Sequence, residues 1–114
     1  MTDLARVRLV ALVGPIAGER RMVHTMNHPL DPAKMLPLAD VLLLESSEDS
    51  GVMLYRYTAW GQPAGDTWHL TIADAKEQAI FEYRDAVGPW FEVPADVPDA
   101  HGFAVRCAAS PREV

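Results

Sequence analysis

The chain has one cysteine, two lysines and no long apolar segment. Cys107 cannot form an intramolecular disulfide alone, so the fold needs no oxidising compartment. The apolar run Leu9–Val13 is far shorter than the roughly 20 residues that cross a bilayer. Asp3, just before it, is not typical of a signal peptide. Together these absences predict a cytoplasmic protein without a membrane partner.

Positive charge is also scarce. Lys and Arg total 10 against 16 Asp and Glu, which gives a formal net charge of −6. Nucleic-acid binding relies on clustered basic side chains, and the only adjacent pair here is Arg20-Arg21. We therefore expect no nucleic-acid partner and a preference for neutral or basic proteins. The excess of Arg over Lys, with abundant Ala, Val and Pro, indicates a GC-rich bacterial genome.

The composition that remains is that of one globular domain spanning residues 1–114, with 49% hydrophobic and 23% charged residues. Several short segments are rich in branched or aromatic residues and end at turn signals, the pattern of β-strands. The continuous apolar run Val41–Glu45 is typical of a strand that is buried on both faces. The expected strands are Val7–Val13, Val41–Glu45, Val52–Thr58 and Asp66–Leu70, with Arg21–Asn27 as a candidate further strand and Trp90–Val93 as a last edge segment.

One helix is predicted over about residues 72–87. Thr71 is the candidate N-cap, because its hydroxyl can accept a hydrogen bond from the backbone amide of Asp74. Gly88 and Pro89 end the segment. The fold class is therefore α+β, an antiparallel sheet of four or five strands with this helix on one face. Prolines predict an irregular tail over 95–114, in which Phe103–Cys107 is a candidate further strand.

The order of residues from strand to helix resembles a pattern shared by small uncharacterised bacterial proteins. It reads YRY, GDTWH, a capping Thr, A..QA..EY and W..VP, and it covers roughly residues 52–94. Trp60 departs from the pattern, which has a polar turn residue there. The resemblance implies a bacterial source and no particular activity.

A cleft between helix and sheet is the candidate small-molecule site. Its predicted binding residues are Tyr55, Tyr57, Trp68 and Tyr83, with His69 and Glu82 as the alternative catalytic pair, because imidazole titrates near neutral pH. Strand alternation places Asp66 and Trp68 on one face and Thr67 and His69 on the other. The structural alternative is that Trp68 fills the core and His69 supports the start of the helix.

Metal and cofactor sites are not expected. His24 and His28 are four residues apart, but they fall in a predicted strand end and loop with no third ligand at a suitable spacing. GPIAG at 14–18 lacks the Lys-Ser/Thr ending of a phosphate loop. The helix carboxylates are most simply a solvated face, and His101 a solvated loop histidine.

Two aromatic residues are predicted to face outward. Phe81 projects about 180° from Ile72 on the helix, and Trp60 falls at a hairpin tip. Either the C-terminal tail covers Phe81, or the two residues form a binding surface or dimer contact, where aromatic residues concentrate.

These patterns favour a non-enzymatic protein-binding module, acting on itself as a homodimer or on another protein. One version is an antagonist of a basic partner, whose association acidic charge would steer. The alternative is a small enzyme or small-molecule binder that uses the cleft around His69.

Overall fold

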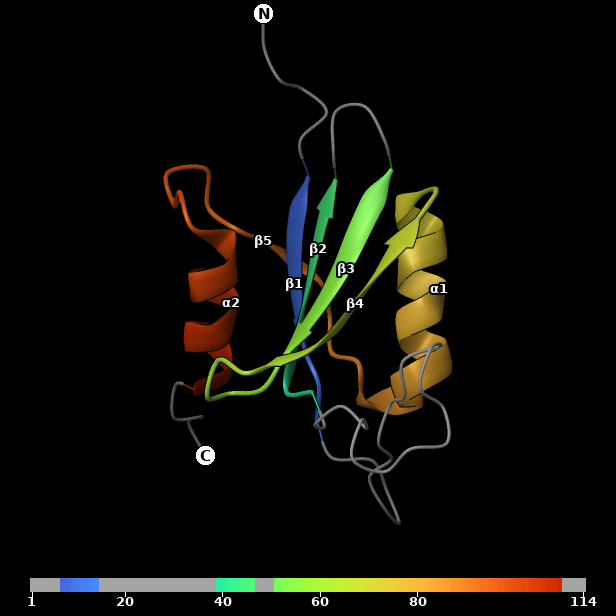
Figure 1. The fold of residues 1–114 in the computed structure, drawn as a ribbon, viewed down its shortest axis with the longest axis horizontal. Coiled ribbons are helices and arrows are strands. Elements are labelled where there is room, and N and C mark those ends of the chain that lie inside the picture. The colour runs from blue at the N-terminus through green and yellow to red at the C-terminus, as the bar shows by residue number, and fades with distance from the viewer. Residues whose placement is uncertain (1–6, 15–38, 47–50, 110–114) are drawn as a thin grey trace, which may run out of the picture.

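A computed structural model describes residues 7–14, 39–46 and 51–109. Five strands form one antiparallel sheet in the order β4-β3-β2-β1-β5 (Figure 1). In chain order the elements are β1 (Arg8–Leu12), β2 (Val41–Ser46), β3 (Val52–Tyr57), β4 (Pro63–His69), α1 (Ile72–Tyr83), the 3-10 turn η2 (Arg84–Ala86), β5 (Phe91–Glu92) and α2 (Ala100–Ala109).

The two helices cover opposite faces of the sheet, so the molecule has three layers (Figure 1). Alternation along each strand sends neighbouring side chains to different layers. On β2, Leu42 and Leu44 pack under α1, whereas Val41 and Leu43 pack under α2. This explains why residues 41–44 are apolar without interruption: all four are completely buried.

Helix α1 begins as its sequence indicates. Thr71 has extended backbone angles, and its Oγ accepts a hydrogen bond from the amide of Asp74 at 3.1 Å. Ala75, Ala79 and Tyr83 are buried against the sheet. The α-helix ends at Tyr83 because Arg84 adopts a φ of 54°, and η2 carries the chain on to Val87. The short strand β5 then forms the sheet edge beside β1.

The predicted α+β class, the antiparallel sheet and the main helix are confirmed, and the described residues form a single domain. The prediction of an irregular tail is wrong for residues 100–109, which form α2, and Phe103–Cys107 is helical rather than a strand. Asp99 accepts a hydrogen bond from the amide of Gly102, so the helix starts with a side-chain cap after Pro98. The predicted strand Arg21–Asn27 lies outside the described residues.

No helix among the described residues combines the length and apolar character needed to cross a membrane.

Candidate functional site

An ion pair joins β3 to α1 inside the molecule. Arg56 is 2% exposed, and its guanidinium grips Glu82 with two hydrogen bonds of 2.7 Å, from Nε to Oε1 and from Nη2 to Oε2. Gln78, one turn earlier on α1, also donates to Oε2 at 2.6 Å. The pair occupies the space between helix and sheet where a cleft was expected.

His69 belongs to the same network. Thr67 accepts a hydrogen bond from Nη2 of Arg56 at 3.1 Å, and its hydroxyl is 2.6 Å from Nε2 of His69, where a neutral imidazole protonated on Nδ1 accepts the hydroxyl proton. This arrangement suits a neutral imidazole. Burial, with the positive charge of Arg56, lowers the pKa of His69 below its ordinary value. His69 thus has a structural hydrogen-bond partner at Nε2.

Tyr83 lies deeper in the same layer. It is 3% exposed, and its hydroxyl makes no hydrogen bond within the described structure. Burial is the main cause that raises the pKa of this phenol far above its ordinary value, so the group stays protonated. A ligand from solvent has no access to it.

The residues predicted to line one cleft are divided between the two faces of the sheet. Thr67 and His69 pair with Leu54 and Val52 and lie on the α1 side. Tyr55, Tyr57 and Trp68 lie on the α2 side, because side chains alternate along β3 and β4. The predicted alternation on β4 is right, but a single site that joins Tyr55 or Tyr57 to His69 is wrong.

On the α2 side, two tyrosines surround a histidine. The imidazole of His101 lies edge-on to the rings of Tyr55 and Tyr57, with centroid distances of 4.6 and 5.7 Å. Its Nδ1 is 2.6 Å from the hydroxyl of Tyr57, and its Nε2 is 3.4 Å from Oε1 of Glu45. The prediction of a solvated loop histidine is therefore wrong, because the first turn of α2 brings His101 onto the sheet.

The surroundings of both tyrosines are acidic. Burial is the main cause that raises the pKa of Tyr55 and Tyr57, and the carboxylates of Glu45 and Asp66 raise each of them further. Asp99 adds to the effect on Tyr57. A cation near these rings would meet a negative field.

Trp68 is 53% exposed, so the prediction that it fills the core is wrong. It sits near the end of the edge strand β4 and pairs with Met53. Its ring packs over Gly51, where an added Cβ would lie 2.5 Å from the indole. Gly51, which also has a φ of 86°, therefore makes the space that this ring occupies.

Among the described residues, Phe81 and Trp60 are the most exposed large hydrophobic side chains, at 78% and 90%. Helix α2 does not cover Phe81, because it packs on the opposite face of the sheet. The prediction that the tail folds over Phe81 is wrong for residues 100–109. Trp60 lies in the turn between β3 and β4. Ile80, the residue before Phe81 on α1, is also 52% exposed.

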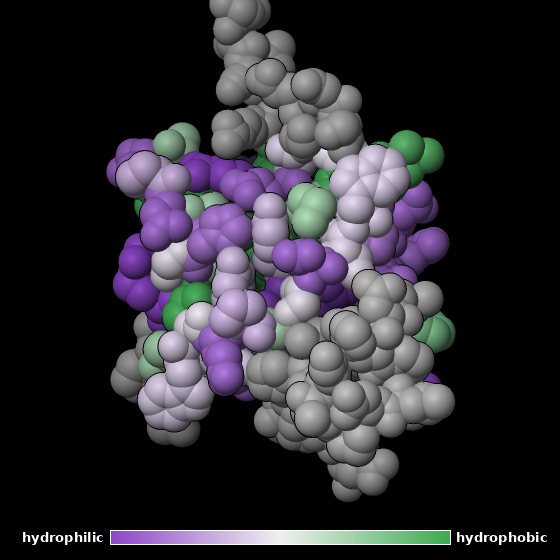
Figure 2. All heavy atoms as spheres, viewed as in Figure 1, coloured by the Kyte–Doolittle hydropathy of each residue, from purple (hydrophilic) through white to green (hydrophobic). Residues whose placement is uncertain are grey.

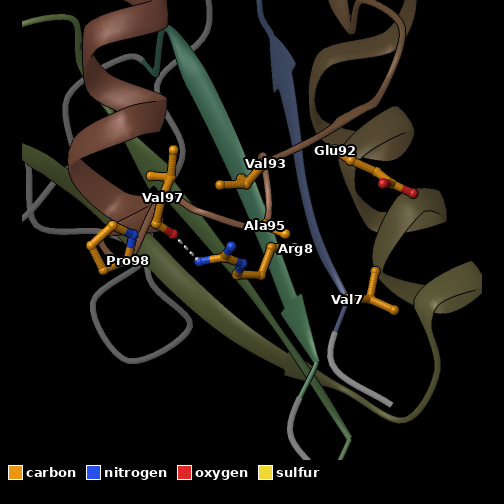
Figure 3. A pocket seen from close by; sticks show the side chains of 7 residues that line it. All are labelled: Val7, Arg8, Glu92, Val93, Ala95, Val97 and Pro98. Atoms are coloured by element: carbon orange, nitrogen blue, oxygen red, sulfur yellow. Dashed lines mark hydrogen bonds between the residues drawn. The ribbon is translucent and has the colours of Figure 1, made fainter. Parts of the chain in front are cut away.

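A hollow of about 540 Å³ opens beside β1 and β5 (Figure 3). The guanidinium of Arg8 crosses it and donates to the backbone oxygens of Val97 at 2.7 Å and Pro94 at 3.0 Å. Arg8 thus holds the segment that leads into α2. The lining residues are Val7, Arg8, Glu92, Val93, Ala95, Val97 and Pro98.

No group of three or more His, Cys, Asp or Glu side chains could hold a metal ion in the described ranges. His24 and His28 lie outside those ranges.

The sequence analysis did not identify Arg56 as a residue of the site, nor the packing of His101 on the sheet. The period-two pattern of β3 could have indicated the first, because Arg56 follows Val52 and Leu54 on the buried face. The position of His101 depends on α2, which was not predicted because the nearby prolines indicated an irregular tail.

Comparison of the chain with protein-family models, curated proteins and solved structures found no match. The resemblance over residues 52–94 therefore stays a prediction, and the function must be argued from the geometry.

Proposed function

We propose that the protein is a non-enzymatic protein-binding module that contacts a basic partner through the outer face of α1. Phe81 supports this proposal: it is an aromatic side chain, 78% exposed, on a face that carries acidic groups. Asp74 and Glu77 precede it at helical spacing on α1, and Asp85 follows it in η2, all three exposed. An aromatic centre with a charged rim is the composition of a binding surface.

The charge favours a different protein over a second copy as the occupant. The exposed charged groups around Phe81 are three carboxylates and one cation, Arg84. Two such faces would bring acidic groups of one copy against those of the other, and like charges across an interface are unfavourable. The net charge of −6 would instead steer a basic protein toward this face. One form of this function is antagonism, in which the module covers the basic surface of its partner.

The probe for this surface is a synthetic amphipathic helix with one leucine face flanked by lysines. We expect it to shift the amide resonances of Glu77 and Phe81 most, and Phe81→Ser to weaken its binding about tenfold, the loss typical of a central interface aromatic. Trp60→Ser is the matched control and should bind like the wild type. Equal binding by Phe81→Ser would contradict the proposal.

Light scattering over a concentration series tests whether a second copy of the chain binds this surface instead. We expect wild type and Phe81→Ser to be monomers at every concentration. A wild-type dimer that the substitution dissociates would show that the face pairs with itself and would overturn the choice of a basic partner.

A further inference from the structure

We propose that the hollow beside β1 and β5 binds a small organic carboxylate, whose anionic group contacts the guanidinium of Arg8 and whose apolar body packs on the walls. Arg8 and the other lining residues are not part of the α1 surface, so this site goes beyond the proposed function and does not depend on it.

The hollow has the size and the lining of a small-molecule site. Its volume of about 540 Å³ falls within the roughly 300–1,000 Å³ that ligand pockets span. Figure 3 shows the side chain of Arg8 extending from β1 toward the segment that leads into α2. Apart from Glu92, the other lining residues are apolar: Val7, Val93, Ala95, Val97 and Pro98. One cationic group among apolar walls suits a ligand with one anionic group and an apolar body.

The hollow belongs to the β5 edge of the sheet because β5 is only two residues long. The amide of Val93 makes a last hydrogen bond to the backbone oxygen of Arg8 at 3.0 Å, and the chain then leaves the sheet toward α2. No described strand continues beside Val7. On the face where β4, the opposite edge strand, crosses in front, Figure 2 shows mainly hydrophilic side chains.

Arg8 has no counter-charge among the described residues. Its direct cross-strand partner is Glu45, a position in which opposite charges attract each other. Glu45 instead contacts His101 at 3.4 Å. The hydrogen-bond partners of Arg8 are two uncharged backbone oxygens, and a guanidinium has more N–H groups than these two bonds use. The half-buried Arg8 therefore has charge and donors left for a carboxylate, which a guanidinium binds through two parallel hydrogen bonds.

The nearby acidic side chains do not occupy this position. Asp99 accepts a hydrogen bond from the amide of Gly102 at 3.0 Å and caps α2. Glu92 pairs with Leu9, so alternation places it on the α1 side of the sheet, whereas Arg8 lies on the α2 side. Glu92 is also exposed, and salt screens an exposed charge more than a contact inside the hollow. We expect the net charge of −6 to weaken the binding of an anion but not to prevent it.

The test is an NMR titration of the full chain with benzoate, with benzamide as the neutral analogue of similar shape. We expect saturable shifts of the amides of Arg8, Val93 and Val97, and benzoate binding at least about threefold tighter than that of benzamide. Arg8→Gln removes the cation, and Ala95→Phe fills part of the hollow without removing it. Each should weaken benzoate binding by a similar factor.

Three variants serve as controls. Arg84→Gln removes an exposed cation that does not line the hollow, and it should bind benzoate like the wild type. Glu92→Gln should bind at least as tightly, because it removes a like charge from the rim. Phe81→Ser, which changes only the α1 surface, should bind like the wild type.

Equal binding of benzamide, or weaker benzoate binding by Glu92→Gln, would overturn the assignment to an anion. Undiminished binding by Ala95→Phe would overturn the location in the hollow, and this variant decides the question even if Arg8→Gln does not fold. Either failure leaves the proposed function standing, because that function is tested by Phe81→Ser with a different probe.

Discussion

At the scale of single residues, Arg56 organises the α1 side of the sheet. It follows Val52 and Leu54 on a face that is otherwise apolar, and it is almost completely buried. A buried charge is costly unless a partner and hydrogen bonds compensate it. Glu82, Thr67 and the backbone oxygen of Leu54 provide that compensation. His69 and Glu82, the predicted alternative catalytic pair, are therefore parts of a structural network around Arg56. Glu82 binds Arg56 directly, and His69 contacts Thr67, which also binds Arg56.

Replacing Glu82 by Gln should destabilise the protein by roughly 3–5 kcal/mol, because it leaves the guanidinium of Arg56 buried without a counter-charge. Chemical denaturation of wild type and variant measures the difference. Glu77→Gln, an exposed carboxylate on the same helix, is the control and should change stability little, because no buried charge loses its partner. A loss below about 1 kcal/mol for Glu82→Gln would show that water or rearrangement relieves the charge.

His69 should make stability depend on pH. Its pKa in the folded state is lowered from 6.5, so the unfolded chain takes up this proton first as the pH falls. The free energy of unfolding should therefore decrease from about pH 7 downward and level off below the folded pKa. The difference between wild type and His69→Gln, measured by denaturation at several pH values, isolates this effect. A constant difference would mean that His69 titrates alike in both states.

At the scale of elements, α2 is the part that decides the architecture. Its Ala100 and Ala104 are buried against Val10, Val41 and Leu43. The small side chains let the helix lie close to the sheet, and His101 then reaches the tyrosines. Without α2, these completely buried strand residues would face water.

Ala104→Asp tests this docking. Ala104 is 0% exposed, so a carboxylate there would be buried without a partner, and we expect a loss of at least about 3 kcal/mol in thermal or chemical unfolding. Ala109→Asp, exposed at the end of the same helix, is the matched control and should cost under about 1 kcal/mol. Similar small losses for both would mean that α2 is not part of the folded core.

At the scale of the whole molecule, the three layers separate two surfaces. Phe81 faces outward from α1, whereas Tyr55, Tyr57 and His101 lie together on the other side of the sheet. The net charge of −6 is the basis for proposing a basic partner for the α1 surface.

The candidate sites were only partly predictable, for reasons that depend on particular residues. The exposure of Phe81 follows from its angular position on α1, and the separation of Trp68 from His69 follows from alternation on β4. The grouping of Tyr55 with His101 does not, since these residues are 46 positions apart in the sequence. Their contact depends on which face of the sheet α2 packs against.

The sequence by itself determined the order of elements from Val52 to Val93: strand, turn, strand, capped helix and edge strand. It did not determine the end of the α-helix, which lies at Tyr83 and not just before Gly88 as predicted. Caps, alternation and turn glycines act within a few residues, so these signals can be recognised without knowing the rest of the fold. Only the tertiary structure decided that α2 covers the second face, that Arg56 pairs with Glu82, and that Tyr55 and Tyr57 lie apart from His69. These outcomes depend on packing between segments that are distant in the sequence. A buried charge needs a counter-charge and an apolar face needs a cover, and residues far along the chain can provide either.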